Sequence, residues 1–217
     1  MVTATSAQTL TLTQWLSPAY PIGAFAYSHG LEAATGQGWV ADADSLQAWL
    51  IVALEQGAGR SDALLIAAAY HAKNPHDVRA IDDTARAFAI SKERRLESEQ
   101  QGASFAKITD SIWGGDLAGL TYPVALGVAA RRADLPLDLT QSLYLQAFLS
   151  NLVAAGQRLA PIGQTAGQAI LNRLSTRLPA LADATAHGDL SQLTSTAFLG
   201  DIASMKHETQ YARIFRT

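Results

Sequence analysis

Apolar residues along the chain recur three or four positions apart in most segments between glycines and prolines. In residues 44–57, for example, Leu46, Trp49, Leu50, Ala53 and Leu54 fall on one face of a helix. No segment has the alternating apolar and polar pattern that would require a strand. The pattern therefore predicts an all-α fold.

Capping residues, glycines and prolines set the expected helix ends. Asp44 followed by Gln47 predicts a helix start, and Ser61 or Asp62 is expected to cap the next, strongly apolar helix. Asn74 before Pro75 predicts a further stop and restart. Helices are also expected over 82–113, from 123 onward, over 138–160, over 164–178 and over 196–213. Because no polar linker or internal repeat interrupts the chain, we expect a single domain over residues 1–217, a bundle of roughly eight to ten helices.

Composition narrows the class of protein. The 217 residues are 48% hydrophobic and 16% charged, which is too apolar for a disordered chain. The longest strictly apolar run, residues 63–70, is too short to cross a membrane, and we expect no membrane association. A net charge of −3 and a pI of about 5.9 argue against nucleic acid as a partner. The absence of cysteine fits a cytoplasmic protein, and the chain start shows no signal peptide.

Residue types that carry catalysis do not gather in the sequence. His71 and His76 cannot meet on one helix across Pro75, whereas His29 and Glu32 could share a helical face but have no third ligand nearby. No nucleophile elbow and no phosphate-binding loop occur, and Glu93, Glu97 and Glu99 are expected on a solvated helix face, where Glu99 can pair with Arg95. We therefore expect no catalytic residue, no resident metal and no cofactor. The alternative, an all-helical enzyme with an unrecognised pocket, would need buried titratable groups that converge.

Two segments are more apolar and aromatic than an ordinary surface. Residues 17–32 read SPAYPIGAFAYSHGLE, and residues 205–217 read MKHETQYARIFRT. As a helix, the second segment would align His207, Tyr211, Ile214 and Phe215 in one stripe. Such a stripe either docks on the chain's own core or binds a partner, and the sequence leaves both alternatives open.

Five segments together resemble the UreF family of urease accessory proteins. They are residues 17–32, 54–62 (LEQGAGRSD), 91–102 (SKERRLESEQQG), 159–168 (LAPIGQTAGQ) and 207–216 (HETQYARIFR), in the family's order and spread over nearly the whole chain. Departures from the family pattern are mild and occur at Tyr20, Ala26, Ile214 and Thr217.

The resemblance implies an adaptor rather than an enzyme. UreF-like proteins form homodimers and join a complex with a UreD/UreH-like protein and the GTPase UreG. That complex acts on apo-urease. The resemblance thus implies a cytoplasmic chaperone that bridges these partners, regulates GTP hydrolysis and assists nickel insertion.

We expect residues 205–217, the tail, to bind a partner, and we expect residues 206–216 within it to be loose in the free protein and to order against the UreD-like partner. The expected partner-binding residues are Pro21, Ile22, Gly23, Phe25 and Tyr27 in the loop, and Lys206, His207, Glu208, Tyr211, Arg213, Phe215 and Arg216 in the tail. A transient nickel contact stays open at His29, Glu32 and His207. The GTPase would be stimulated either by an arginine, for which Arg94, Arg95 and Arg158 are the candidates, or by stabilisation of the GTPase dimer.

Overall fold

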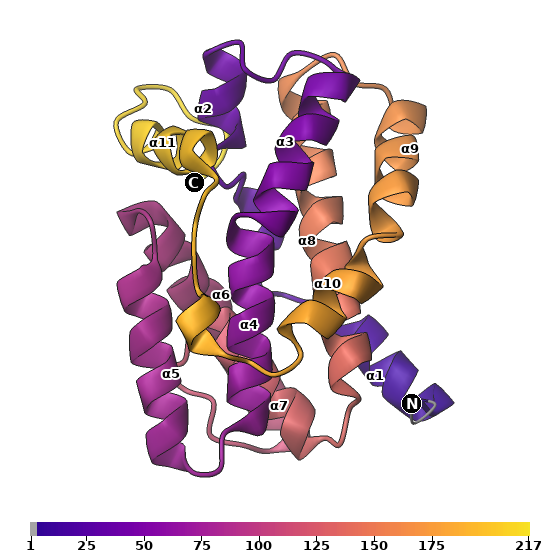
Figure 1. Cartoon of the computed structure of the whole chain (residues 1–217), viewed down its shortest axis with the longest axis vertical. Coiled ribbons are helices and arrows are strands. Elements are labelled where there is room, and N and C mark those ends of the chain that lie inside the picture. Colours follow the sequence, from indigo (N-terminus) through magenta and orange to yellow (C-terminus); the bar gives the residue numbers. More distant parts are fainter. Residues whose placement is uncertain (1–3) are drawn as a thin grey trace.

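The computed structural model describes residues 4–217, which fold into eleven α-helices and two short 3-10 helices (Figure 1). The α-helices are α1 (Ser6–Trp15), α2 (Leu31–Gly36), α3 (Ala43–Glu55), α4 (Ala58–His71), α5 (Pro75–Phe88), α6 (Lys92–Trp113), α7 (Tyr122–Arg132), α8 (Leu137–Leu159), α9 (Gln164–Ser175), α10 (Leu178–Thr185) and α11 (Phe198–His207). The 3-10 helices are η1 (Ala24–Ala26) and η2 (Leu190–Gln192). Because the described residues contain no strand, the predicted all-α class is confirmed.

Helix α4 runs through the middle of the bundle, with α5 on one side and α8 and α9 on the other (Figure 1). Every residue from Ala63 to Ala69 is buried, as expected for its apolar run. It packs against α7 at very close range because Gly127 has no side chain, and a Cβ there would lie 2.3 Å from the Ile66 carbonyl oxygen. No helix within residues 4–217 is both long and apolar enough to cross a membrane.

Several helix starts differ from the prediction because a better cap lies nearby. Helix α3 is capped by Asp42, whose carboxylate accepts the N–H of Ser45, and not by Asp44 with Gln47. Helix α4 begins directly after Gly57, so Ser61 and Asp62 lie inside it and are buried. The predicted restart at Pro75 is confirmed, since the Asn74 side chain accepts the N–H groups of His76 and Asp77.

Three expected helices are interrupted or shortened. The predicted helix over 82–113 is divided into α5 and α6, because Ser91 is extended and its hydroxyl accepts the N–H of Arg94 as an N-cap. The helix expected over 164–178 ends at Ser175, and Pro179 restarts α10. The last helix ends at His207, so residues 208–217 are irregular and the predicted helical stripe in the tail is wrong.

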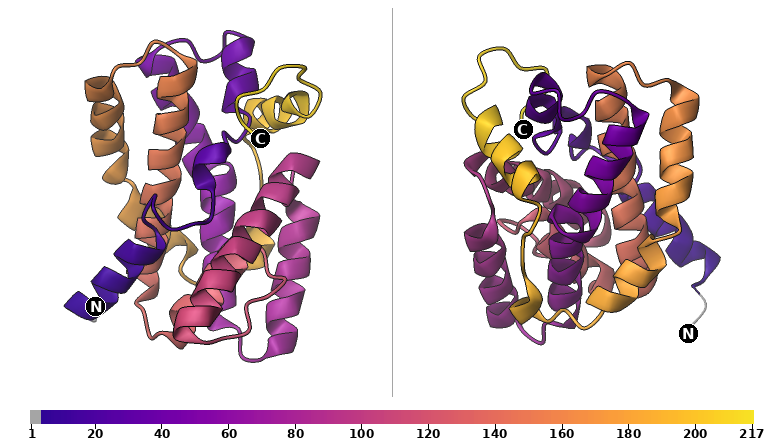
Figure 2. Two further views of the ribbon diagram at one scale, coloured as in Figure 1. Left: turned by 180° about the vertical axis from the view of Figure 1, so that it is seen from behind. Right: turned by 45° about the horizontal axis from the view of Figure 1, so that its top comes forward.

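Segments from both halves of the sequence meet at one end of the bundle. Helix α11 packs against α2 and against α6, and η1 packs against α8. In Figures 1 and 2 the irregular tail runs beside α2 and ends next to the loop that precedes it. This end therefore joins the two segments that sequence analysis selected.

Candidate functional site

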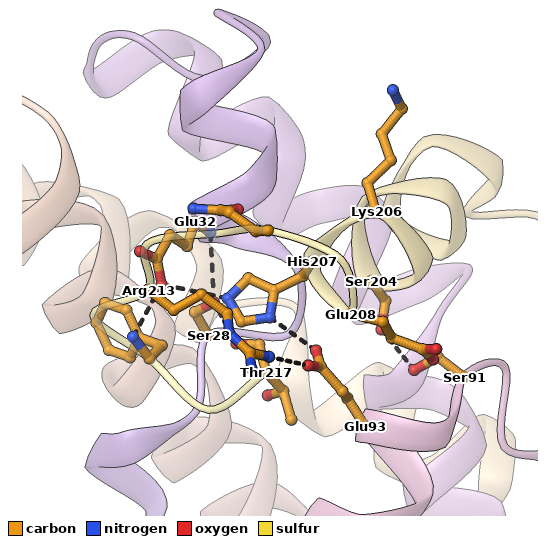
Figure 3. Close-up of polar contacts among 12 residues, drawn as sticks. Ser28, Glu32, Ser91, Glu93, Ser204, Lys206, His207, Glu208, Arg213 and Thr217 are labelled. Carbon is orange, nitrogen blue, oxygen red and sulfur yellow. Dashed lines mark hydrogen bonds and ion pairs between the residues drawn. The ribbon is translucent and has the colours of Figure 1, made fainter.

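Glu32 on α2 binds the tail through both oxygens of its carboxylate (Figure 3). Oε1 accepts the N–H of Ile214 at 2.7 Å, and Oε2 accepts the N–H of Phe215 at 2.8 Å. The His207 ring lies on the same carboxylate, with Nε2 3.2 Å from Oε2. Hydrogen bonds to an ionised acceptor are among the stronger ones in proteins. They hold residues 214 and 215 out of a helix, which explains why the predicted helical stripe does not form.

His207 is fully buried between two carboxylates. Its Nδ1 lies 2.7 Å from Oε2 of Glu93, opposite the contact with Glu32. Each ring nitrogen therefore lies within hydrogen-bond distance of a different carboxylate. Arg213 donates from Nη1 to the other oxygen of Glu93 at 2.6 Å. A histidine and an arginine thus contact two carboxylates in this cluster of four residues.

A second buried ion-pair network lies deeper in the bundle. Arg94 Nη2 is 2.6 Å from Oδ2 of Asp62, and its Nη1 is 3.4 Å from Oε1 of Glu97, which also lies 2.9 Å from Nε2 of His29. Burial acts to raise the pKa of Glu97, but His29 and Arg94 outweigh it and hold that pKa below its ordinary value. Burial raises the pKa of the Tyr144 hydroxyl well above its usual value, and Asp62 raises it further, so Tyr144 remains a donor to Asp62.

The second network reaches the tail through Thr217. Its hydroxyl donates to Oε2 of Glu97 at 3.2 Å. Its backbone oxygen accepts two hydrogen bonds from Ser28, one from the N–H at 2.8 Å and one from the hydroxyl. The chain can turn here because His29 and Gly30 have positive φ angles of 53° and 76°. Gly30 also touches α11, where a Cβ would lie 2.6 Å from the backbone nitrogen of Ser204. The left-handed turn therefore brings the loop, α11 and the tail together.

A cavity of about 440 Å³ lies beneath the loop, between α1, α6, α7 and α8. Its walls are mainly apolar, and the titratable side chains that line it include His29, Arg94 and Glu97. All three are held in ion pairs with one another, as described above. Across residues 4–217, no three or more His, Cys, Asp or Glu side chains gather in a way that could hold a metal ion.

Comparison with known proteins identifies the family of this chain. The family model of UreF matches residues 40–175, which is more than half of the 217 residues. The chain belongs to the UreF family. A relative from Ruegeria pomeroyi, a urease accessory protein UreF, is 55% identical over 217 residues and 100% of both chains. Relatives of the same name from Roseobacter denitrificans and Methylorubrum populi are 52% and 46% identical, over 96% of this chain and 93% and 98% of their own.

The resemblance to UreF proteins is therefore confirmed, and the chain has a role in urease maturation. The segments 17–32, 91–102 and 207–216, which carried the resemblance, contain most of the groups that join the loop, α6 and the tail. These three segments thus meet at one end of the bundle.

In this UreF-family chain the loop residues selected from the sequence divide between surface and interior. Phe25 is 65% exposed, Pro21 is exposed, and Ile22 and Gly23 are half-buried. Tyr27 is buried, and its hydroxyl donates to Gln100 of α6 at 2.8 Å. The loop thus presents Phe25 to the outside while Tyr27 fixes it to α6.

The tail residues divide in the same way. Tyr211 is fully exposed, and Lys206 and Arg216 are also exposed. Phe215 is buried instead, with the Arg158 guanidinium 5.7 Å from its ring centre, so it anchors the tail to the chain's own core. Glu208 accepts the N–H of Lys92 at 2.8 Å. The structure therefore shows the tail docked, whereas we expected it to be loose in the free protein.

The positions that the sequence predicted for some charged residues are wrong. Glu93 and Glu97 do not lie on a solvated face but are buried, and only Glu99 forms the expected i,i+4 pair, 2.9 Å from Arg95. His29 and Glu32 do not share a helical face, because His29 precedes α2 and pairs with Glu97. Arg94 is fixed in the interior by two carboxylates, which removes it from the arginines that could reach a GTPase.

Sequence analysis also missed an exposed apolar stripe on α11. Phe198, Leu199, Ile202 and Met205 are between 43% and 68% exposed, and their spacing puts them on one face of the helix. The spacing of these residues was visible in the sequence, but a helix with one apolar face usually packs that face against the protein core. Only the structure shows that α11 turns a different face, with Ala203, Ser204 and His207, toward the bundle.

Proposed function

We propose that this chain is an adaptor of urease maturation that bridges a UreD/UreH-like protein and the GTPase UreG. In this role it regulates GTP hydrolysis and assists the insertion of nickel into apo-urease. Support comes from the relatives, which are named urease accessory proteins, and from one observation above all. The loop, α11 and the tail form a continuous region with exposed apolar side chains at one end of the bundle.

Large apolar side chains are exposed both on α11 and in the tail that follows it. Besides the four residues of the α11 stripe, Tyr211 is fully exposed and Ile214 is 71% exposed. Single exposed apolar residues are common, but a concentration of large ones marks a protein-binding surface. We call these six residues the tail surface and assign them to the UreD/UreH-like partner.

The border of the tail surface is basic. Lys206 and Arg216 are exposed, and Arg213 keeps 40% of its side chain exposed although it pairs with Glu93. An apolar centre with a charged border is the usual anatomy of a specific protein interface. The partner surface is accordingly expected to be apolar with acidic residues around it.

For the GTPase, Arg95 and Arg158 remain as candidates. Arg95 is 55% exposed, whereas Arg158 is tied to the loop by a hydrogen bond of 3.1 Å to the Phe25 carbonyl oxygen. Stabilisation of the GTPase dimer is the alternative to either arginine. The proposed assembly contains this chain as a homodimer, as in the family.

A nickel contact at His29, Glu32 or His207 would have to open existing ion pairs. His29 is paired with Glu97, and His207 with Glu32. Any such contact is therefore transient in this proposal, and the metal is held by the partner proteins.

Deletion of the gene in its own host tests the proposal. We expect nickel-dependent urease activity to be lost while the urease subunits are still made, because apo-urease then lacks its metal. Re-expression of the chain should restore activity, and the chain should co-purify with the UreD-like protein and the GTPase. Normal urease activity in the deletion strain would contradict the adaptor function.

A further inference from the structure

We infer that Glu32 is the positioning residue that decides which tail side chains are presented to the partner. It does so from the interior, since its side chain is only 7% exposed. The inference rests on the proposed adaptor function, because the partner is the UreD/UreH-like protein assigned to the tail surface.

The position of the Glu32 carboxylate is fixed by its helix. Its neighbours Leu31, Ala33 and Ala34 are all buried in the core. Gly30, directly before α2, touches the backbone of α11 at Ser204, so α2 and α11 cannot shift independently. A side chain held on a packed helix gives a more exact reference point than one on a loop.

Two successive backbone N–H groups of the tail donate hydrogen bonds to this carboxylate, at 2.7 Å and 2.8 Å (Figure 3). His207, at the end of α11, is bound to the same carboxylate, so Glu32 joins both ends of the turn formed by residues 208–213. Because Glu32 binds backbone N–H groups and not side chains, this contact fixes the position of the tail backbone.

The residues that follow alternate between surface and interior. Ile214 is 71% exposed, Phe215 is 4% exposed, Arg216 is exposed and Thr217 is buried. Residues 214 and 215 form a bend that turns both of their N–H groups toward Glu32, and a shift of the chain by one residue against this carboxylate would bring different side chains to the surface. By binding the N–H groups of residues 214 and 215, Glu32 selects the register that turns Ile214 and Arg216 outward.

Only a carboxylate of this length fits the three donors. Glutamine has the same size, but it offers one acceptor oxygen and would turn its NH₂ group toward another N–H. In Glu32→Gln at least one backbone N–H of the tail therefore loses its acceptor. Aspartate keeps both oxygens on a stem that is one methylene shorter.

The test combines amide hydrogen exchange with partner recovery, on the full chain. For Glu32→Gln we expect the amides of residues 214 and 215 to exchange at least about tenfold faster, which corresponds to the loss of one charge-assisted hydrogen bond. Recovery of the UreD-like protein in a pull-down should fall in parallel, and Glu32→Asp should restore part of both signals. Glu99→Gln is the matched control, because it removes a carboxylate of α6 that pairs with Arg86 and Arg95 and not with the tail.

Should Glu32→Gln fail to fold, Ile214→Pro removes one of the two donors from the tail side at an exposed position. The inference is overturned if exchange at residues 214 and 215 is unchanged in Glu32→Gln, or if exchange at residue 215 is unchanged in Ile214→Pro, which has no amide N–H at 214. It is equally overturned if exchange rises while partner recovery stays at the wild-type level. Failure of the wild-type chain to recover the UreD-like protein would instead overturn the proposed function, and exchange alone would then decide whether Glu32 positions the tail.

Discussion

Single residues in this protein are often held by charges that lie far away in the sequence. Glu93 and His207 are 114 positions apart, and Glu32 and Ile214 are 182 apart. The identity of each residue could be read from the sequence, but its partner could not, because spacing rules connect only neighbours on one helix. This is why Glu93 and Glu97 were assigned to a solvated face.

Glu97 provides a test at the scale of one residue. Its pKa is lowered from the ordinary value of 4.5, with burial opposed by His29 and Arg94. A carboxyl group whose folded pKa is depressed stabilises the protein above its unfolded pKa, and this contribution is lost as pH falls through the folded pKa. At neutral pH we expect Glu97→Gln to lower the free energy of unfolding by about 3 kcal/mol, because Arg94 and His29 lose a buried partner.

Urea unfolding between neutral pH and about pH 3 measures this effect. The difference between wild type and Glu97→Gln should shrink as pH falls below about 4.5, because the unfolded chain then binds a proton at Glu97 that the folded carboxyl, with its lowered pKa, does not yet bind. Glu99→Gln serves as control and should cost less than Glu97→Gln, since the Glu99 side chain is 30% exposed in its pairs with Arg86 and Arg95, whereas Glu97 is 1% exposed. A constant difference across the whole pH range would contradict this account of Glu97.

At the scale of helices, periodicity predicted which segments are helical better than where they end. The helices expected over 44–57 and 138–160 are present as α3 and α8, with ends shifted by one or two residues. The break between α5 and α6 was missed because Ser91 competes as an N-cap inside a long favourable pattern. The spacing of apolar residues in the tail favoured a helix. The tail is irregular instead, because its N–H groups donate to Glu32, which is distant in the sequence, and these hydrogen bonds override the local preference.

Gly127 tests the contact between the two helices that pack most closely. In Gly127→Ala the new Cβ would lie 2.3 Å from the Ile66 carbonyl oxygen, so α7 must move away from α4. We expect a loss of about 3 kcal/mol in the free energy of unfolding and a lower Tm, as for other overpacked cores. Gly36→Ala, where no atom lies within 4 Å, should leave the Tm unchanged or slightly raised. Equal Tm values for the two variants would refute the close contact.

For the whole molecule, the resemblance in sequence showed which segments matter, and the structure showed that they meet. The sequence alone selected the loop and the tail by their aromatic and apolar content, but it could not show that both contact one buried carboxylate, that of Glu97. The exposed stripe of α11 depended on the orientation of a helix in the finished fold, which local pattern does not determine.

Ile202→Glu probes the tail surface as a unit. Ile202 is 43% exposed at the centre of the α11 stripe, so a charge there should leave the fold and Tm unchanged. Recovery of the UreD-like protein in a pull-down should fall by at least about tenfold, since central apolar residues dominate interface energies. Leu10→Glu, on α1 and 69% exposed, is the control and should recover the partner normally. Unchanged recovery with Ile202→Glu would remove α11 from the interface.

The long separation in sequence between Glu32 and the tail residues that donate to it also has a consequence for synthesis of the chain. The ribosome makes Glu32 182 residues before Ile214, which at ordinary elongation rates is a delay of roughly 10–40 s. During that time the carboxylate of α2 has none of its three donors, and the register of the tail does not exist. A nascent chain that has not yet reached residue 214 therefore lacks the contact that sets the tail, and under the proposed function it is expected to recover less of the UreD-like partner than a chain that includes the tail.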